Sequence, residues 1–263
     1  MARGSENRRD GHSSSRPLPL ASSLQSAESA LVIFAKAPIP GEVNTRLCPP
    51  LTPDEAATLH GSFVLDMLER TKLAAATLQL PYHRYRACAP SSELVFFKIM
   101  EERQGVPLLD QIGEDLGQRI HRTFIDLFAK GYKQVIIVGT DVPTLPLSVY
   151  QEAFARLGRS DVVLGPALDG GYYLIGLKRP AEKLFTGVPW STDHVLAVTQ
   201  QRAKTLGLSV ELTAAWRDVD TIADLQALIT ECREDNKKPK KDRTFSMRTA
   251  GTLQLLETRL KTR

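Results

Sequence analysis

The chain alternates short, continuously apolar segments with amphipathic stretches of helical spacing, and this alternation constrains its fold more than any other feature. A strand that is buried on both faces is apolar throughout, whereas a strand with one wet face alternates. LVIF at 31–34 and QVIIV at 134–138 are of the first kind. The pattern predicts an α/β fold in which a mostly parallel central sheet lies between two layers of helices.

The predicted helices and strands follow one another along the chain. A capping box in TPDE, residues 52–55, begins a helix that runs to about residue 71. Further helices are expected over 93–104, the second half of 113–131, 148–158, 191–207 and 221–234. Strands are expected over 31–36, 82–90, 134–141 and, as strand, turn and strand, 161–177, with extended segments at 106–111 and 208–220.

Composition separates a folded body from two basic ends. Residues 28–232 carry 20 basic and 24 acidic side chains, so the net charge of +4 and the pI of about 9.0 come from the ends. We expect a disordered, serine-rich extension at 1–27, one folded domain at 28–232, and a basic tail at 233–263 with a helix allowed over 249–262. Because the excess basic residues are not on a folded face, a nucleic-acid partner is not expected.

Membrane proteins and disulfide-rich proteins are also disfavoured. No apolar run approaches the roughly 18 residues that span a bilayer, so no membrane span is expected. The three cysteines, Cys48, Cys88 and Cys232, are widely spaced and form no C-x-x-C pair. They are typical of reduced thiols in a cytoplasmic protein rather than of a zinc site or a disulfide framework.

Ligands of open parallel sheets bind beyond the carboxyl ends of the strands, and four such ends carry unusual chemistry here. FAKAPIPGEVNTRL at 34–47 follows the first strand. Its prolines and Gly41 stiffen a path for backbone N–H groups, and Lys36 and Arg46 are suited to phosphate. The alternative is a surface loop with two solvated charges. The segment matches neither the Walker A motif nor G-x-G-x-x-G.

Two further strand ends are acidic. GTDVP at 139–143 ends the most apolar strand with Asp141, a charge that is costly to bury without a cation or several donors. Asp141 is therefore a candidate ligand for Mg²⁺ or Mn²⁺ that bridges a bound di- or triphosphate, the alternative being a cap of the next helix or turn. WRDVDT at 216–221 places two acids on one face of an extended segment, and Asp220 either joins this site or caps the following helix.

The fourth strand end is DGGYY at 169–173. Gly170 and Gly171 permit a close approach of the backbone to a ligand, and the tyrosines could stack on a sugar or base. An ordinary hairpin turn of the Asp-Gly type explains the same residues. Three acidic sites and one basic loop at strand ends together favour one shared crevice.

These motifs, in this order, resemble the DUF2064 family of bacterial GT-A-fold proteins, which are often labelled glycosyltransferases. The resemblance covers about residues 30–230 and extends through LTPDEAATLHGSFVLDML, GEDLGQRI, PWSTDHVL and DVDTIADL. More distantly, the chain is similar to the guanylyltransferases of molybdenum-cofactor and F420 synthesis. The resemblance implies a GT-A, Rossmann-like three-layer sandwich with a nucleotide-binding half, an acceptor-binding half and a divalent metal between them.

The same resemblance implies a role for each candidate residue. The nucleotide phosphates would contact Lys36, Gly41 and Arg46, and Mg²⁺ or Mn²⁺ would be bound by Asp141 and Asp220. Base or ribose contacts would come from Gln111, Gly113 and Gly117. The acceptor side would be lined by Asp169, Gly170, Gly171, Tyr172, Trp190, Ser191 and Thr192, with helix capping as the alternative for Ser191 or Thr192.

Three functions stay open at this point. The first is metal-dependent transfer of a sugar from a nucleotide-diphosphate sugar to a small-molecule acceptor, with Asp141, Lys36 and Asp169 as catalytic residues and Asp169 as the base of an inverting reaction. The alternative is nucleotidyl transfer from an NTP with release of pyrophosphate. Gly139 favours it, because glycosyltransferases of this fold usually present Asp-x-Asp at that place. The third is a non-catalytic nucleotide-binding module.

Overall fold

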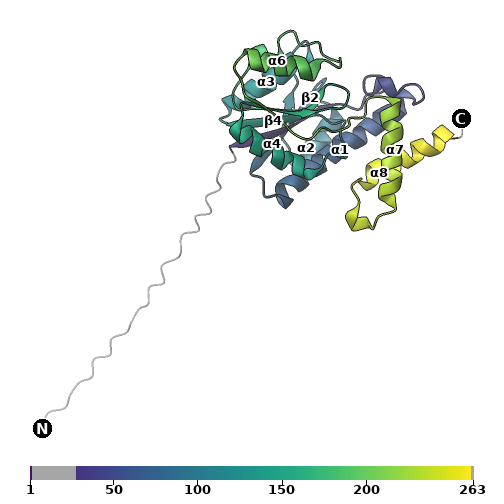
Figure 1. The fold of residues 1–263 in the computed structure, drawn as a ribbon. Helices are drawn as coiled ribbons and strands as arrows, with labels where there is room; N and C mark the ends of the chain where they lie inside the picture. The colour runs from purple at the N-terminus through teal and green to yellow at the C-terminus, as the bar shows by residue number, and fades with distance from the viewer. Residues whose placement is uncertain (2–27, 262–263) are drawn as a thin grey trace.

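The computed structural model describes Met1 and residues 28–261 and shows an α/β fold around a seven-stranded sheet (Figure 1). The strands are β1 Ser29–Lys36, β2 Tyr82–Ala89, β3 Leu108–Asp110, β4 Gln134–Val138, β5 Val162–Pro166, β6 Tyr172–Leu177 and β7 Val210–Leu212. Their order across the sheet is β3-β2-β1-β4-β6-β5-β7. β6 is antiparallel to β4 and β5, and the other neighbours are parallel, so the predicted mostly parallel sheet is confirmed.

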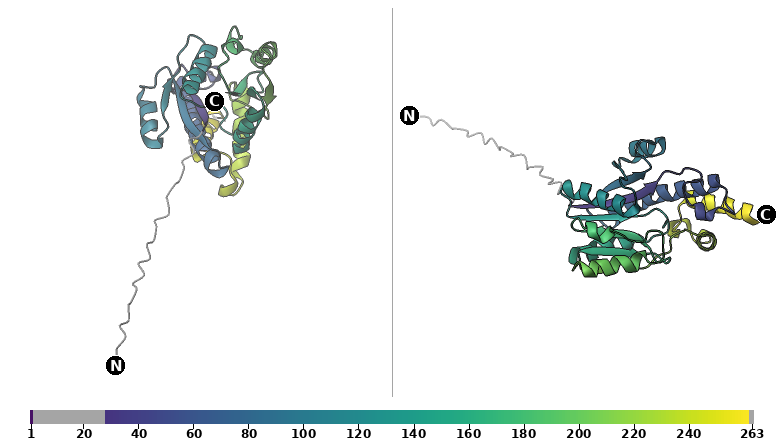
Figure 2. Two further views of the ribbon diagram at one scale, coloured as in Figure 1. Left: turned by 90° about the vertical axis from the view of Figure 1, so that its left-hand side faces the viewer. Right: turned by 90° about the horizontal axis from the view of Figure 1, so that it is seen from above.

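Helices cover both faces of this sheet, as the two side views show (Figure 2). They are α1 Pro53–Thr77, α2 Val95–Gln104, α3 Leu116–Ala129, α4 Leu147–Arg159, α5 Glu182–Phe185, α6 Val195–Thr205, α7 Ile222–Asn236 and α8 Met247–Lys261, with 3-10 turns η1 Thr45–Leu47 and η2 Lys240–Asp242. α1, α2 and α4 pack on one face and α3, α5 and α6 on the other. The predicted three-layer sandwich is therefore confirmed.

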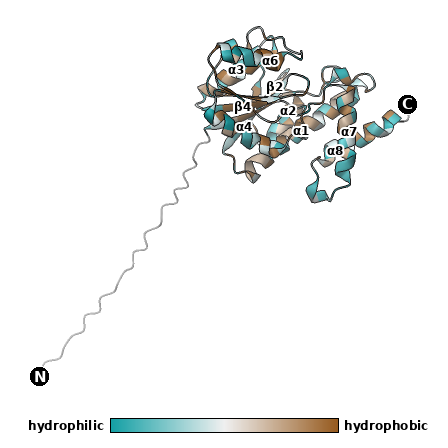
Figure 3. Cartoon of the chain, viewed as in Figure 1, coloured by the Kyte–Doolittle hydropathy of each residue, from teal (hydrophilic) through white to brown (hydrophobic). Residues whose placement is uncertain are grey.

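The apolar strands supply both cores of the sandwich. In β1, Leu31 and Ile33 join the core under α1, α2 and α4, whereas Ala30 and Val32 join the core under α3, α5 and α6. Successive residues of a strand point to opposite faces, so a strand with helices on both sides is apolar throughout. Figure 3 shows the result, with hydrophobic central strands and hydrophilic outer surfaces on the helices.

The C-terminal segment packs against the body at the end away from the start of β1 (Figure 1). α8 lies on α1 and α7, where Leu253 and Leu256 are buried in a third core. The buried carboxylate of Asp66 in α1 accepts hydrogen bonds from Thr249 and from Arg248, the latter at 2.8 Å. The helix allowed in the basic tail thus exists and contributes to the packing.

The remaining expectations for the ends concern the membrane and the N-terminus. Within residues 28–261 the model contains no helix with the length and apolar character that crossing a membrane would require. The disordered extension expected at 1–27 lies outside the described residues, apart from Met1.

Candidate active site

The strand order changes direction at β1 and β4. From β1 the chain proceeds outward through β2 to β3 and then returns to β4 on the other side of β1. The loops that leave two such strands diverge and leave a crevice at their carboxyl ends. A cavity of about 520 Å³ lies there, and its lining includes Lys36, Arg46, Asp141 and Asp220. The structure thus brings four of the five charged residues selected from the sequence into one cavity, whereas Asp169 is not in its lining.

The acidic segment 216–220 is tied to the loop after β4. The backbone N–H of Val219 donates to the carbonyl oxygen of Asp141 at 2.9 Å. The indole N–H of Trp216 donates to Oγ1 of Thr144 at 3.2 Å. These two bonds place acids from distant parts of the sequence beside one another.

Four carboxylates interact electrostatically where segment 216–220 meets the loop after β4, namely those of Asp141, Asp169, Asp218 and Asp220. Burial, and then the charges of Asp169, Asp141 and Asp220, raise the pKa of Asp218 to about 7. Burial also raises the pKa of Asp220, although Arg46 opposes that effect. Neighbouring like charges are unfavourable unless a proton or a cation joins them. Asp218 was not selected from the sequence, and its only signal was the alternation of acids in DVD.

Three cations line the same cavity. Lys36 ends β1, Arg46 lies in η1, and Arg119 lies in α3. Arg46 forms an ion pair with Asp220 and has a side chain that is 64% exposed. Nε of Arg119 donates to the carbonyl oxygen of Gly113 at 2.9 Å. Arg119 was missed in the sequence, where only its place in the GEDLGQRI segment could have indicated it.

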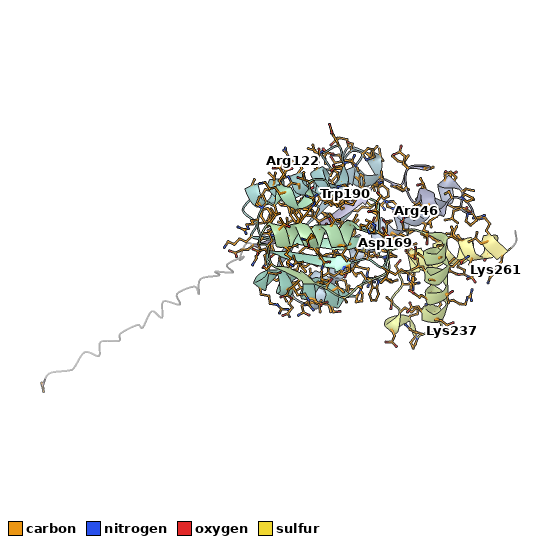
Figure 4. The ribbon with its side chains drawn as sticks, turned by 45° about the horizontal axis from the view of Figure 1, so that its top comes forward. Arg46, Arg122, Asp169, Trp190, Lys237 and Lys261 are labelled. Carbon is orange, nitrogen blue, oxygen red and sulfur yellow. The ribbon has the colours of Figure 1, made fainter. Side chains whose placement is uncertain are left out.

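The positions of these side chains can be followed in Figure 4. Arg46 and Asp169 lie at the end of the body nearest α7 and α8, whereas Arg122, on α3, lies toward the other end. Arg46 of the cavity is therefore well separated from Arg122 of α3.

Asp141 and Asp220 fit a hard divalent cation. Mg²⁺ is usually bound by one or two carboxylates together with water and substrate phosphates. Oδ1 of Asp141 is buried and has no hydrogen-bond partner among the described residues. In that same part of the chain, no three side chains of His, Cys, Asp and Glu are placed to bind a metal by themselves. The pair therefore suits an ion that arrives together with phosphate.

The predicted base-binding residues have structural contacts as well. Gln111 lines the cavity, and its amide nitrogen donates to the carbonyl oxygens of Ala35 at 3.1 Å and Ala87 at 2.9 Å. A Cβ atom on Gly117 would lie 2.6 Å from the indole ring of Trp190, so the ring requires a glycine there. Two other glycines selected from the sequence, Gly41 and Gly113, are not among the residues that line this cavity.

The predicted acceptor-side residues divide into two groups. Tyr172 and Ser191 line the cavity, whereas Trp190 and Thr192 are not in its lining. The rings of Trp190 and Tyr172 pack edge to face with centroids 6.4 Å apart. The hydroxyl of Thr192 donates to the carbonyl oxygen of Pro189 at 2.7 Å. The side chains of Trp190 and Thr192 therefore serve local structure in this state.

The DGGYY turn is a tight backbone feature. Oδ1 of Asp169 accepts a hydrogen bond from the N–H of Gly171 at 2.8 Å. Gly170 has a φ of +92°, and a Cβ atom there would lie 2.1 Å from the carbonyl oxygen of Asp193. Both glycines thus shape the turn that presents Asp169 beside the other acids, without a role in ligand contact being required.

A larger cavity of about 740 Å³ lies between α1, α7 and the loop before α8. One of the cations in its lining, Arg70, donates to the carbonyl oxygen of Leu145 at 3.0 Å and to that of Thr244 at 3.2 Å. These bonds hold the loop in place, and the lining includes none of the charged residues Lys36, Asp141 and Asp220. The smaller cavity is therefore the candidate active site.

Comparison with known proteins identifies a family model and a solved structure that are similar to this chain. Residues 71–192 match the family model described as an uncharacterized protein conserved in bacteria, DUF2064. A solved structure from Desulfovibrio desulfuricans G20, provisionally described as a nucleotide-diphospho-sugar transferase, is 30% identical, with a TM-score of 0.76, and the match covers 90% of this chain and 98% of that one.

Two further similarities concern nucleotide enzymes. The 2-phospho-L-lactate guanylyltransferase of Methanothermobacter thermautotrophicus is 25% identical over 189 residues, which are 70% of this chain and 78% of that protein. The structure of CMP:2-keto-3-deoxy-manno-octonic acid synthetase complexed with CTP is 12% identical with a TM-score of 0.51, over 79% of this chain and 99% of that one. The second similarity concerns the fold alone.

Proposed function

The chain belongs to the DUF2064 family and has the fold of nucleotide-using transferases, and on that premise we propose that it is a metal-dependent nucleotidyltransferase. It would transfer the nucleotidyl group of an NTP to a small-molecule acceptor and release pyrophosphate. The 25% sequence identity to a guanylyltransferase over 189 residues supports this choice.

The composition of the 520 Å³ cavity carries the proposal. Lys36, Arg46 and Arg119 line it, and the strand end presents Asp141 with Gly139 two residues before it. A triphosphate has more negative charge than the diphosphate of a nucleotide sugar, so three cations match it better. The glycine also departs from the Asp-x-Asp arrangement expected for sugar transfer.

Each charged residue would have a defined task in this reaction. Asp141 and Asp220 would hold Mg²⁺ or Mn²⁺, which when bound supplies Lewis-acid stabilisation of the phosphates and of the leaving pyrophosphate. Lys36 and Arg119 would bind and orient the phosphate chain. Arg46 would leave Asp220 for a phosphate oxygen, an exchange of one anionic partner for another.

The acceptor would enter from the side of Asp169. That carboxylate is exposed next to the crevice and is held by the N–H of Gly171. A hydroxyl acceptor would need a general base there, and Asp169 stays our candidate for it. An acceptor that is already a phosphate anion would need none.

Sugar transfer is the second candidate. The observation that favours it is the 30% identity to the protein from Desulfovibrio desulfuricans G20, described as a nucleotide-diphospho-sugar transferase. The same cavity could hold the diphosphate of such a donor, and the leaving group would then be a nucleoside diphosphate.

Product analysis separates the two reactions. The protein is incubated with each NTP, Mg²⁺ and pools of phosphorylated or hydroxylated metabolites, and pyrophosphate is measured. Release of a nucleoside diphosphate from a nucleotide sugar, without pyrophosphate from any NTP, would replace our proposal by sugar transfer. Neither product, together with retained nucleotide binding, would indicate a binding module.

A substitution tests the metal assignment. Asp141→Asn should abolish metal-dependent turnover with little change in the thermal midpoint, because the charge is needed by the cation and not by the fold. Asp126→Asn, on the exposed side of α3, is the matched control and should leave turnover unchanged. An Asp141→Asn protein that unfolds, yet keeps metal-dependent binding per folded molecule, would show that Asp141 is structural.

A further inference from the structure

Arg70 of α1 joins two loops that are distant in the sequence. Its Nε and Nη2 both donate to the carbonyl oxygen of Leu145, with Nε at 3.0 Å. Its Nη1 donates to the carbonyl oxygen of Thr244 at 3.2 Å. Leu145 lies between β4 and α4, and Thr244 lies just before α8. One half-buried guanidinium therefore links the loop that contains Asp141 to the C-terminal segment.

Thr244 continues this link to α7. Its backbone N–H donates to Oδ2 of Asp235 at 2.8 Å. The side chain of Asp235 is 3% exposed, and it belongs to α7, the helix that begins shortly after Asp220. The contacts of Arg70, Thr244 and Asp235 thus tie the helix that follows Asp220 to the loop that contains Asp141.

Two direct contacts join the same parts of the chain nearer the 520 Å³ cavity. The N–H of Val219 donates to the carbonyl oxygen of Asp141 at 2.9 Å, and the indole N–H of Trp216 donates to the same loop. Both donors precede Asp220 in the sequence, whereas the link through Arg70 reaches the helix that follows it. The position of Asp220 relative to Asp141 is therefore fixed from both sides.

We propose that Arg70 is a positioning residue for the cation site. It sets the placement of the Asp141 and Asp220 carboxylates relative to each other, although it is not among the residues that line the 520 Å³ cavity. The groups of a binding site have to be held within about 0.5 Å of their productive geometry, so a shift of one carboxylate against the other weakens binding. This inference rests on the proposed function, because it presupposes a divalent cation at these two carboxylates.

Arg70→Met removes the guanidinium and keeps an unbranched side chain in a cavity that Leu73, Leu147 and Phe245 also line. The Kd for Mn²⁺ in the presence of a non-hydrolysable NTP analogue, measured per folded molecule, should rise about 2- to 30-fold. The Kd of the analogue in the presence of a chelator should stay unchanged, because Arg70 does not line the cavity proposed for the nucleotide. Free Mn²⁺ is measured by electron paramagnetic resonance.

Arg84→Met is the matched control. Arg84 of β2 is also half-buried, and its Nη1 donates to the carbonyl oxygen of Leu68 in α1 at 3.1 Å, but neither residue lines the 520 Å³ cavity. Both variants should lose stability in urea denaturation, and only Arg70→Met should lose Mn²⁺ affinity. If Arg70→Met does not fold, the shorter polar variant Arg70→Gln takes its place with the same expected loss.

The contrary outcomes separate this role from the proposed function. Wild-type Mn²⁺ affinity in the folded Arg70 variant, or an equal loss of affinity in Arg84→Met, would overturn the positioning role alone. A wild-type protein that binds no Mn²⁺ with the analogue would overturn the metal assignment, and this role with it.

Discussion

Replacing Arg46 with glutamine should have opposite effects on the two ligands of the cavity. In the free protein Arg46 is ion-paired with Asp220. The guanidinium is expected to bind phosphate, and the carboxylate is expected to bind the cation. The substitution therefore removes a competitor of the metal and a donor to the nucleotide at the same time. Metal alone should bind more tightly, and nucleotide more weakly.

The exposed fractions set the magnitudes. The two side chains are 64% and 36% exposed, and an exposed pair contributes about 0–1 kcal/mol, so the free energy of unfolding should fall by no more than that. The metal alone should gain at most about fivefold in affinity, which corresponds to about 1 kcal/mol. A hydrogen bond to a charged group contributes about 1.5–3 kcal/mol, or about 10- to 150-fold in Kd. Since Arg46 is largely exposed, we expect the lower end for the nucleotide, about tenfold.

Calorimetric titration with Mn²⁺ alone, and with an NTP analogue and Mn²⁺, measures both affinities, and urea denaturation measures stability. Arg122→Gln is the matched control, because Arg122 pairs with Asp126 at 2.9 Å with side chains 53% and 33% exposed, away from the cavity (Figure 4). It should change neither affinity. If Arg46→Gln lowers both affinities together, or costs several kcal/mol of stability, the ion pair is structural and the exchange of partners is refuted.

Two further predictions concern packing and pH. Gly117→Ala would place a methyl group 2.6 Å from the ring of Trp190, and such overpacking typically costs about 1–3 kcal/mol in urea denaturation; an unchanged stability would mean that the ring can move aside. In the metal-free protein the pKa of Asp218 is raised from 3.8 to about 7, chiefly by burial, so between these pH values the folded state binds more protons than the unfolded state. The free energy of unfolding should therefore fall as the pH rises through this window. With a chelator present, the thermal midpoint of Asp218→Asn should fall less with rising pH than that of the wild type. Identical pH profiles of the thermal midpoint for the variant and the wild type would contradict the raised pKa of Asp218.

Local signals in the sequence were sufficient for the strongly patterned elements of the fold, whereas the short helix α5 was not predicted. The capping box at Thr52 and Glu55 is present in α1, and the apolar run at 134–138 is β4. Segments with weaker local preferences differ from expectation. The helix expected from residue 191 begins at Val195, after a turn in which Ser191 has a φ of +65°. The extended segment expected over 208–220 contains only the short β7, because the rest is tied down by single contacts such as that of Val219.

The α/β class and the positions of Lys36 and Asp141 at or just beyond the carboxyl ends of β1 and β4 follow from the sequence alone, because strands buried on both faces are apolar throughout. Asp220 lies instead in the loop between β7 and α7. Which of these segments meet depends on the tertiary fold, since the adjacency of β1 and β4 is a long-range contact. For the same reason the place of Arg119 of α3 in the lining of the cavity became visible only in the fold. Conversely, the sequence makes Gly117 a candidate for ligand contact, whereas in the structure the close approach of the Trp190 ring explains why a glycine is needed there.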